Sequence, residues 1–391
     1  VQHALVGMQV AVAVAVVAGA GLLLRSVWEA DSVAIGIDTE HVISARFAGG
    51  SDRYPTGLDM NELLERVRGH LAEDSRFLST ARVPFAPLAE PHVHRDGYWV
   101  QGNDGEWRAA VGDARGLDPE YFQILGIEPV AGRLPTAEDG PQAPRVAVVN
   151  RTFFDRYLDG VAGIGALMRG CDPERPCGPE VRVVGVVEDV RVNGAEFAVE
   201  PEIFLPLEQT NWVTNVLVAR VTGPPEAALA HLVGVAQGFD PELAVRDAGT
   251  LEDFRRETVA PRRFMAGLLL AFAAVAGGLA LTGVFCVTAL TVAARGREIG
   301  IRRALGASDR QAERLVLREG LAVVAVGWAI GLLLTLSVGR FIEGLLFQTR
   351  PNEPVTLAAA AGVFLIAASV ACIVPARRVA RIEIPDTLSA P

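Results

Sequence analysis

The sequence predicts a membrane protein with four transmembrane α-helices and one large mixed α+β extracytoplasmic domain, inserted between spans 1 and 2. Two observations carry this prediction. Four stretches, each long enough to cross a bilayer, contain no charged residue, and a long segment of ordinary globular character separates the first from the second. Half of the 391 residues are apolar and the mean hydropathy is positive, which is high for a soluble protein.

The charge-free stretches fit spanning helices in order along the chain. A spanning helix needs about 20 mostly apolar residues, because the hydrocarbon core is ~30 Å thick and a helix rises ~1.5 Å per residue. The four stretches are residues 4–24, 264–294, 320–339 and 354–376. A cleaved signal peptide is the alternative for the first, but its apolar run is too long and lacks a basic start. Buried core helices are the alternative for the others. The predicted domains are a first transmembrane helix over 1–25, an outside domain over 26–262 and a helical domain over 263–391.

Arginines in two short segments set the predicted orientation. Residues 295–319 connect the second and third spans and are rich in arginine, and the tail at 377–391 starts with Arg377 and Arg378. Loops rich in Lys and Arg stay in the cytoplasm. Both segments are therefore expected to be cytoplasmic, which leaves residues of about 26–262 outside.

The outside domain is predicted to mix helices and strands. A helix is expected over 61–72 and another over 224–237, with strands over 145–150, 181–190 and 215–223. Asn150 is placed to cap a helix over 151–158. Thr250 and Asp253 have the spacing of a near capping box. They would start a stalk helix over 250–262 that runs into the second span, with Pro261 as a candidate kink.

Three groups in the outside domain have side chains that bear on chemistry. Cys171 and Cys177 lie in a Pro-rich loop on the oxidising side, so the sequence favours a disulfide, with free thiols as the alternative. His92, His94 and Asp96 resemble a metal cluster, but a polar loop is the better interpretation, and no metal or cofactor is expected. Glu188 and Asp189 are adjacent at a strand end and would point to opposite faces, which disfavours paired acid–base chemistry.

Composition excludes several functions. The net charge is −10, which disfavours nucleic acid as a partner. The chain contains no lysine, so the phosphate-binding loop G-x-x-x-x-G-K-[ST] is impossible here. No acidic residue or histidine lies in the middle of a span, so proton-coupled transport lacks a relay. Gly327 and Gly331 form a G-x-x-x-G pattern; close helix packing and generic tolerance of glycine in membrane helices both explain it.

The segment "ARGREIGIRRALGAS" at 294–308 is the strongest candidate for a functional site. Glu298 and Arg302 are four apart and would pair on a helix. A short apolar stripe is formed by Ile299, Ile301, Ala304 and Leu305, and Gly306 suits the end of that helix. An amphipathic helix on the membrane surface and docking into a groove on a cytoplasmic partner both fit this pattern. A second helix is expected to start at Ser308 and to run into the third span.

Several motifs resemble one family. "REIGIRRALGAS" followed by "LVLREG" looks like the loop of FtsX/MacB-type permeases of ABC transporters. "LDPEYFQILGIEPVAGR", "VAVVNRTFFDRYL" and "VVGVVEDVR" resemble their MacB-like periplasmic core domain, and "PARRVARIEIPDTL" resembles their tail, although "IEIPDTL" departs from the more usual "DP…AL". The resemblance covers nearly the whole chain in the same order. The nearest subgroup looks like the duplicated permeases of the acidobacterial type, of which this would be the C-terminal half.

The resemblance implies a non-catalytic permease subunit in a bacterial cytoplasmic (inner) membrane. Its expected partners are a separate ATP-binding cassette subunit that carries the ATP, a second permease half or copy, membrane lipid, and a periplasmic adaptor or outer-membrane component. The family loop that contacts the ATPase matches Arg297, Glu298, Ile299, Gly300, Ile301, Arg302, Arg303, Ala304, Leu305, Gly306 and Ala307. A membrane regulator or sensor of the FtsX-like type, which signals to an outside partner without transport, is the alternative.

Overall fold

The computed structural model describes residues 2–50, 54, 57–89, 95–171, 177–194, 197–294, 309–342 and 354–378. The chain divides into two compact units. The helical unit consists of Val1–Ser32 and Val259–Pro391; the second unit, Val33–Thr258, is called the outside unit after the location that the sequence predicts for it. Each unit has its own hydrophobic core.

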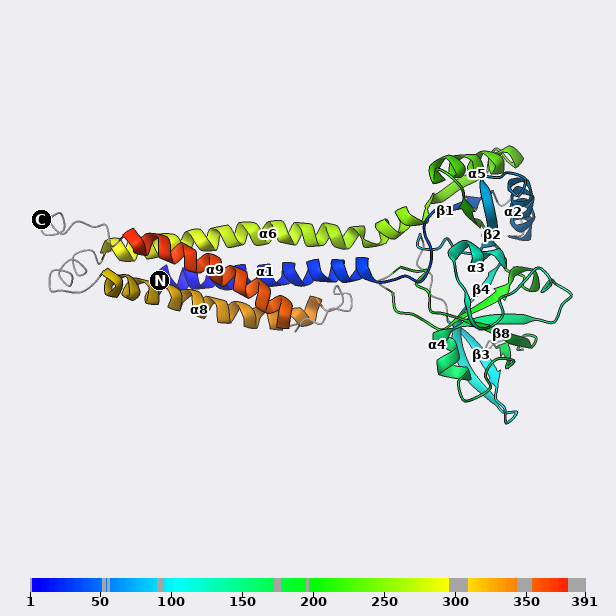
Figure 1. Ribbon diagram of the computed structural model, residues 1–391, viewed down its shortest axis with the longest axis horizontal. Helices are drawn as coiled ribbons and strands as arrows, with labels where there is room; N and C mark the ends of the chain where they lie inside the picture. Colours follow the sequence, from blue (N-terminus) through cyan, green and yellow to red (C-terminus); the bar gives the residue numbers. More distant parts are fainter. Residues whose placement is uncertain are drawn as a thin grey trace, which may run out of the picture. The chain divides into compact units, whose positions relative to one another are not determined.

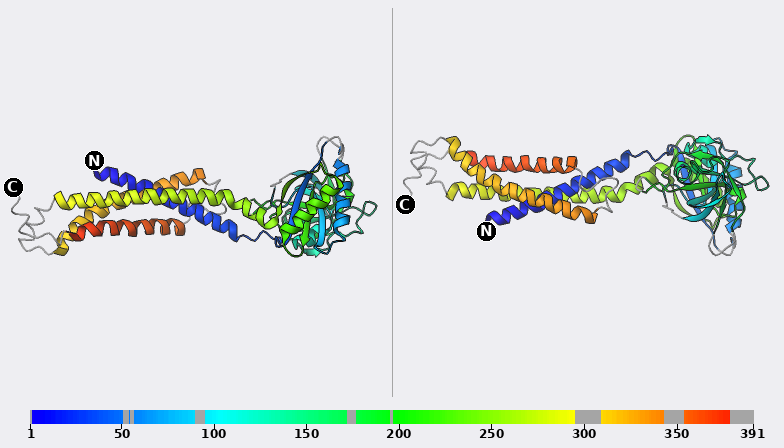
Figure 2. Two further views of the ribbon diagram at one scale, coloured as in Figure 1. Left: turned by 90° about the horizontal axis from the view of Figure 1, so that it is seen from above. Right: turned by 90° about the horizontal axis from the view of Figure 1, so that it is seen from below.

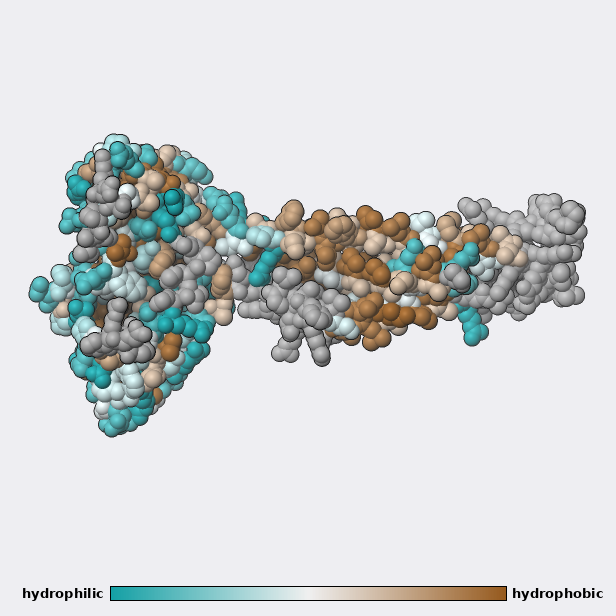
Figure 3. Space-filling model, turned by 180° about the vertical axis from the view of Figure 1, so that it is seen from behind, coloured by the Kyte–Doolittle hydropathy of each residue, from teal (hydrophilic) through white to brown (hydrophobic). Residues whose placement is uncertain are grey.

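The helical unit is built from four long helices that lie side by side (Figures 1 and 2). They are α1 (Gln2–Ser32), α6 (Leu251–Ala294), α8 (Asp309–Ile342) and α9 (Pro354–Arg378). Three of them contain segments long and apolar enough to cross a membrane, namely Gln2–Glu29, Leu251–Ala294 and Gly320–Ser337. In the described part of α9 the apolar segment is the shorter Gly362–Val374. The surface of these helices is mainly hydrophobic (Figure 3), as expected for helices whose outer faces meet lipid.

A four-stranded antiparallel sheet forms one half of the outside unit. Its strands are in the order β11-β1-β10-β2. They are β1 (Val42–Ala48), β2 (Phe77–Val83), β10 (Val216–Val221) and β11 (Ala244–Thr250). Helices α2 (Gly57–Leu71) and α5 (Pro225–Phe239) bury their apolar faces against one side of this sheet. Leu63 and Leu64 of α2 and Leu232 of α5 are fully buried there. In each helix the 3.6-residue period gathers the apolar side chains on the face that meets the sheet.

A closed ring of strands forms the other half. The seven-stranded sheet runs β5-β8-β6-β9-β4-β3-β7, and β7 also pairs with β8. The strands β8, β6, β9, β4, β3 and β7 therefore make a barrel, with β5 added outside β8. Their bounds are β3 (Asp96–Gln101), β4 (Trp107–Leu117), β5 (Pro129–Gly132), β6 (Val146–Asn150), β7 (Leu167–Gly170), β8 (Val181–Val187) and β9 (Glu202–Pro206). Small and branched side chains such as Ala114, Val149 and Ile203 fill its interior.

A third cluster of apolar side chains joins the two halves. It includes Val42, Val216 and Val218 from the free face of the four-stranded sheet, and Phe122 and Leu125 from α3 (Glu120–Leu125). Phe122 meets Phe204 of β9 edge to face, with ring centroids 5.5 Å apart. The outside unit is therefore one body with a continuous core, and not two loosely linked domains.

The local signals in the sequence identify several elements well. Asn150 caps the next turn, since its side chain accepts a hydrogen bond from the Phe153 backbone N at 2.9 Å. The predicted helix over 151–158 is divided into α4 (Arg151–Phe153) and one π-helical segment (Phe154–Leu158). A short 3₁₀ turn (Leu207–Gln209) follows β9. The strands of the barrel other than β6 and β8 have no equivalent among the predicted elements.

Candidate functional site: the helical coupling path

The predicted coupling residues 297–307 lie outside the described part of the chain, but the helices on both sides of them are described. Helix α6 ends at Ala294 and α8 begins at Asp309. The described surroundings of the candidate site are, in the helical unit, the helices packed against α6 and, separately in the outside unit, the contacts at the first turn of α6.

Helix α6 starts with a complete side-chain cap on the last residue of β11. The Asp253 backbone N donates to Thr250 Oγ1 at 3.0 Å, and the Thr250 hydroxyl donates to the Asp253 carboxylate at 2.7 Å. From there α6 runs for 44 residues with Pro261 inside it. A helix of this length is about 66 Å long, roughly twice the ~30 Å of the hydrocarbon core. One continuous helix thus runs from a strand of the outside unit to the residue before the predicted coupling loop.

Glu252 fastens the first turn of α6 to the segment that precedes β1. Its carboxylate accepts a hydrogen bond from Thr39 Oγ1 at 3.0 Å. It also pairs with Arg255 at 2.9 Å and Arg256 at 3.1 Å, one turn further along the helix. Thr39 lies between α1 and β1, so this carboxylate links the segment that enters the outside unit to the helix that leaves it.

Two glycines of α8 bring this helix into backbone contact with α1. A Cβ atom on Gly327 would lie 2.6 Å from the Gly7 carbonyl oxygen, and one on Gly331 would lie 2.6 Å from the Ala11 carbonyl oxygen. Real Cβ atoms do not approach oxygen so closely, so only glycine permits this distance. Of the two explanations for the G-x-x-x-G pattern, close packing is therefore correct.

Helices α6, α8 and α9 meet near the start of the third predicted span. A Cβ on Gly320 of α8 would lie 3.2 Å from Cys372 Sγ of α9 and 3.4 Å from Thr288 Oγ1 of α6. The side chains around this contact are apolar, including Val284 and Val324. The three helices are therefore in direct packing contact at this point.

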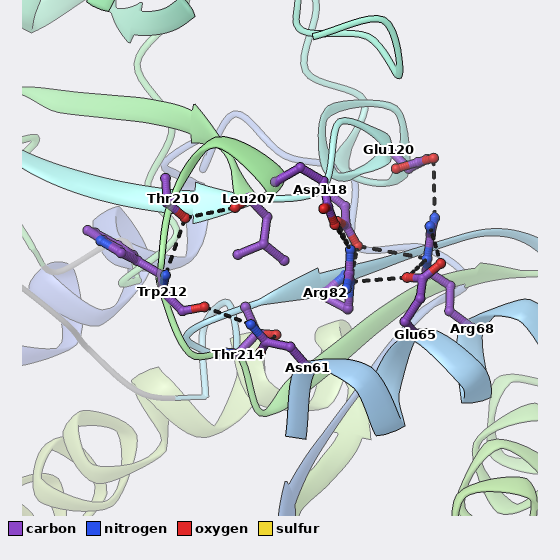
Figure 4. A network of polar contacts seen from close by, with 11 residues as sticks. Asn61, Glu65, Arg68, Arg82, Asp118, Glu120, Leu207, Thr210, Trp212 and Thr214 are labelled. Carbon is purple, nitrogen blue, oxygen red and sulfur yellow. Dashed lines mark hydrogen bonds and ion pairs between the residues drawn. The ribbon is translucent and has the colours of Figure 1, made fainter. Parts of the chain in front are cut away.

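A charged joint connects the four-stranded sheet with the barrel (Figure 4). Arg82 of β2 donates from Nε and Nη2 to the Asp118 carboxylate, both at 2.9 Å, and its backbone N donates to the same carboxylate at 2.8 Å. Asp118 follows β4 directly. The Arg82 side chain is 6% exposed and that of Asp118 is 3% exposed, so this ion pair is buried. Burial and the neighbouring carboxylates have opposite effects on the pKa of Arg82, and the net shift is upward, which keeps the guanidinium charged.

Polar groups of α2 extend the joint on both sides. Arg68 pairs with Glu65 at 2.8 Å and with Glu120 of α3 at 3.4 Å (Figure 4). At the other end, Asn61 accepts a hydrogen bond from the Thr214 backbone N at 2.7 Å and donates to the Trp212 carbonyl at 2.8 Å. These contacts tie α2 to α3 and to the segment between β9 and β10.

A second buried charge cluster lies between β4 and β9, where the sequence analysis predicted nothing. Asp113 and Glu202 are partners in the parallel register of these strands. Arg115 Nη2 lies 2.9 Å from Asp113 Oδ2 and 3.1 Å from Glu202 Oε1. Burial is the main cause that raises the pKa of Glu202, to about 7; the Asp113 charge also raises it, and Arg115 opposes the shift. Sequence spacing carried no signal, because the two acids are far apart along the chain.

The other candidate residues that the structure describes form a disulfide, an ion pair and hydrogen bonds within the outside unit. Cys171 and Cys177 form a disulfide with an S–S distance of 2.04 Å. Glu188 pairs with Arg151, and Asp189 accepts hydrogen bonds from the Thr152 backbone N and hydroxyl. His92 and His94 lie outside the described residues. Within the ranges that the structure describes, no group of three or more His, Cys, Asp or Glu side chains is placed to hold a metal ion.

Comparisons with known proteins match both halves of the chain. A family model described as the MacB-like periplasmic core domain matches residues 9–259, and one described as FtsX-like permease C-terminal matches residues 270–384. The second match includes the predicted coupling loop.

Similar proteins carry export functions in their names. The pyoverdine export ATP-binding/permease protein PvdT of Pseudomonas fluorescens (strain Pf0-1) is 37% identical over 289 residues, which cover 68% of this chain and 41% of that protein. The macrolide export ATP-binding/permease protein MacB of Sodalis glossinidius is 26% identical over 299 residues, which cover 72% of this chain and 44% of that protein. The chain thus spans less than half the length of these curated relatives.

Among solved structures, the periplasmic region of MacB from Actinobacillus actinomycetemcomitans matches with 13% identity and a TM-score of 0.39, over 57% of this chain and 95% of that chain. The family assignment depends on the sequence models. The core-domain model alone covers more than half of the 391 residues, and the permease model covers most of the rest. The chain therefore belongs to the MacB/FtsX-type ABC transporter permeases, which join a MacB-like periplasmic core domain to an FtsX-like permease domain.

Proposed function

We propose that this chain is the permease subunit that couples ATP hydrolysis on a separate ATP-binding subunit to motion of its outside domain, for export or release of a substrate at the outer face. The observation that carries the proposal is helix α6. It begins with a capped turn on a strand of the outside unit and ends at the residue before the predicted coupling loop. No pore is needed for such a mechanism, because rigid elements with two arrangements transmit the movement.

These 391 residues cannot bind ATP through the usual phosphate-binding loop, because that loop requires a lysine and the chain has none. In the proposal, a separate subunit binds the ATP. The relatives are named as ATP-binding and permease proteins together, which agrees with a functional pairing of the two activities. In the proposed complex, Ile299, Ile301 and Leu305 fill a groove on the ATP-binding subunit. Glu298 pairs with a basic group there or braces its own helix through Arg302.

Closure of the ATP-binding subunits would push on the loop and so on the end of α6 and the start of α8. The contact between Gly320, Thr288 and Cys372 would pass the displacement to α9. The glycine seam, which is the contact of Gly327 and Gly331 of α8 with α1, would pass it to α1. At the other end of α6, Glu252 and the Thr250 cap would deliver it to the outside unit. The buried joint at Arg82 and Asp118 would make that unit respond as one body.

The proposal is tested by co-purification. The gene would be expressed with its neighbouring genes, the membrane fraction would be extracted in mild detergent, and the extract would be tested for a bound ATP-binding subunit with ATPase activity. Glu298→Ala and Leu305→Arg are expected to abolish the association. Glu62→Ala and Leu78→Arg are matched controls, because both side chains are exposed on the outside unit and should leave the association unchanged.

If the loop variants bind the ATP-binding subunit as well as the controls do, the coupling role of the loop is wrong. If no ATP-binding subunit associates with the chain at all, a membrane regulator that signals to an outside partner becomes the better account. A transport assay distinguishes the permease from the regulator. ATP-dependent release of a substrate into the outer medium supports the permease. A complex that hydrolyses ATP and releases no substrate supports the regulator.

A further inference from the structure

The buried cluster of Asp113, Arg115 and Glu202 has no part in the coupling path. We propose that it is a proton-binding site of the outside unit, at which one proton is held by the two carboxyl groups and stabilises the barrel. The ligand is the proton itself, taken up from the compartment that bathes this unit. The inference is independent of the proposed function, because it concerns only residues within the outside unit.

Charge balance is the first argument. Two carboxylates and one guanidinium would leave a net charge of −1 in a place where Asp113 is 2% exposed and Glu202 is 4% exposed. Arg115 Nη2 contacts both acids. An unbalanced buried charge is strongly unfavourable, and a carboxyl group in such a site usually takes up a proton instead. One proton on the pair brings the cluster to neutrality.

Hydrogen bonding is the second argument. Asp113 Oδ1 and Glu202 Oε2 are both buried and have no hydrogen-bond partner in the part of the chain that the structure describes. An ionised carboxylate only accepts hydrogen bonds, so two ionised groups cannot satisfy each other. A protonated carboxyl group has an O–H to donate. Asp113 and Glu202 are register partners on neighbouring parallel strands, which brings the two groups to the same region of the sheet.

The space beside the cluster suits a proton and its water, and not a metal ion. Both acids line a cavity of about 10 Å³, which has room for about one water molecule. The segments 190–194 and 197–200 form its other walls. Calcium and magnesium require about six oxygen ligands. Two carboxyl groups that share a guanidinium do not supply that set.

The charged and titratable groups around Glu202 have fixed partners of their own. Asp189 is bonded to Thr152, Glu200 pairs with Arg95, and Arg191 donates to the Phe197 carbonyl. Tyr121 of α3 is buried, and its pKa is raised, chiefly by burial, so it stays neutral. Asp113 and Asp189 add negative charge near Glu202, and Arg115 opposes them. Burial and these acids together place the pKa of Glu202 at about 7.

The sign of the pH effect follows from this upward shift. An unfolded glutamate releases its proton near pH 4.5, whereas the folded protein keeps it until about pH 7. The stabilisation is therefore complete below pH ~4.5 and is lost as the pH rises to about 7. Within that window the contribution of this group to the unfolding equilibrium constant grows by up to about tenfold per pH unit.

The test compares the full chain in detergent with Glu202→Gln, which has the shape of the protonated acid and does not titrate. Urea unfolding of the outside unit would be followed by tryptophan fluorescence from pH 4.5 to 8. The ratio of the wild-type unfolding constant to that of Glu202→Gln is expected to rise by about 100-fold or more across this range. Glu226→Gln is the matched control, because Glu226 is exposed in the first turn of α5 and does not line this cavity, so its ratio to wild type should not change over the upper half of the range.

A ratio that does not change with pH would overturn the proposal. Infrared spectroscopy of the wild-type chain covers the case in which the variant does not fold. A buried protonated carboxyl C=O band is expected at pH 5.5 and should be lost by pH 8. With Asp113→Asn the band should disappear at a lower pH, since one negative neighbour is gone. Absence of the band throughout would show that the cluster does not bind a proton.

Discussion

Arg82 and Asp118 show how much a buried charge depends on one neighbour. Three hydrogen bonds from Arg82 end on the Asp118 carboxylate, and both side chains are almost fully buried. Glu208 also contacts Arg82 at 2.8 Å, but its side chain is 55% exposed. Solvent screens an exposed partner and does not screen a buried one, so the two acids should differ greatly in their effect on stability.

The first prediction follows from this difference. Asp118→Asn is expected to lower the free energy of unfolding of the outside unit by about 3 kcal/mol, because it removes the one buried carboxylate that pairs with the Arg82 guanidinium and leaves only solvent-exposed partners. Glu208→Gln should lower it by less than about 1 kcal/mol. Urea denaturation of both variants gives the two values. Equal losses would mean that the joint is stabilised mainly by apolar packing and not by the buried pair.

Residues that act through their nearest neighbours in sequence were predictable, and those that act across strands were not. Asn150 and Thr250 cap the turns that follow them, so the spacing to the next backbone N–H groups was enough to identify both. Asp113 and Glu202 become neighbours only through the parallel pairing of β4 and β9. No periodicity in either segment indicates that register.

At the scale of elements, α8 is positioned by the two glycines that face α1. A second prediction tests this contact. Gly331→Val is expected to lower the melting temperature of the detergent-solubilised chain by several degrees, because a side chain at this position would overlap the Ala11 carbonyl. Gly277→Val is the matched control on α6, since a Cβ atom at that position would have no other atom within 4 Å.

If Gly277→Val destabilises the chain as much as Gly331→Val, the loss would come from valine in a membrane helix and not from the seam. Substitution by alanine, which is smaller than valine, is a further test of this contact. Gly327→Ala and Gly331→Ala test the distance itself, because even one methyl group would lie 2.6 Å from a carbonyl oxygen of α1. Both should be less stable than wild type.

The third prediction concerns the start of α6. Thr250→Val removes the hydroxyl that bonds the Asp253 backbone N and carboxylate. Loss of such a cap weakens a helix start by about 1 kcal/mol. Hydrogen exchange of the backbone amides at 252–254 should therefore become about five times faster, while amides in the middle of β10 stay unchanged. Thr250→Ser is expected to keep the wild-type rate, because serine supplies the same acceptor.

Element prediction succeeded for the long apolar runs and missed several strands of the barrel, including short ones and the longer β4. Helices α1, α6 and α8 follow from apolar runs of twenty residues or more. The strands β3, β5 and β7 are four to six residues long, and each has at most one buried residue. Their pairing is decided by the closure of the barrel, which brings β7 to both β3 and β8.

At the scale of the whole molecule, the predicted topology gives a fourth prediction. In cells that produce a chain with Cys286→Ser, Cys372→Ser and Ser308→Cys, a membrane-impermeant thiol reagent should label Cys171 and Cys177 only after reduction, because they form a disulfide. The introduced thiol in the coupling loop should be labelled only after the inner membrane is permeabilised. Labelling of this thiol in intact spheroplasts would reverse the orientation inferred from the arginines.

The folding order of the outside unit follows from its strand pairing. Strand β1 pairs with β10 and β11, and β4 pairs with β9. These early strands therefore cannot complete their pairing until the later strands have been synthesised. At a synthesis rate of ~5–20 residues per second, the roughly 200 residues from Val42 to Thr250 take roughly 10–40 s to appear. Until β10 has been made, β1 lacks both of its partner strands, and the edge of β4 that pairs with β9 stays open until Pro206 has been made. The unit should therefore need a chaperone in the compartment where it folds, and a ribosome that stalls before Thr250 should leave an aggregation-prone chain and not a smaller folded domain.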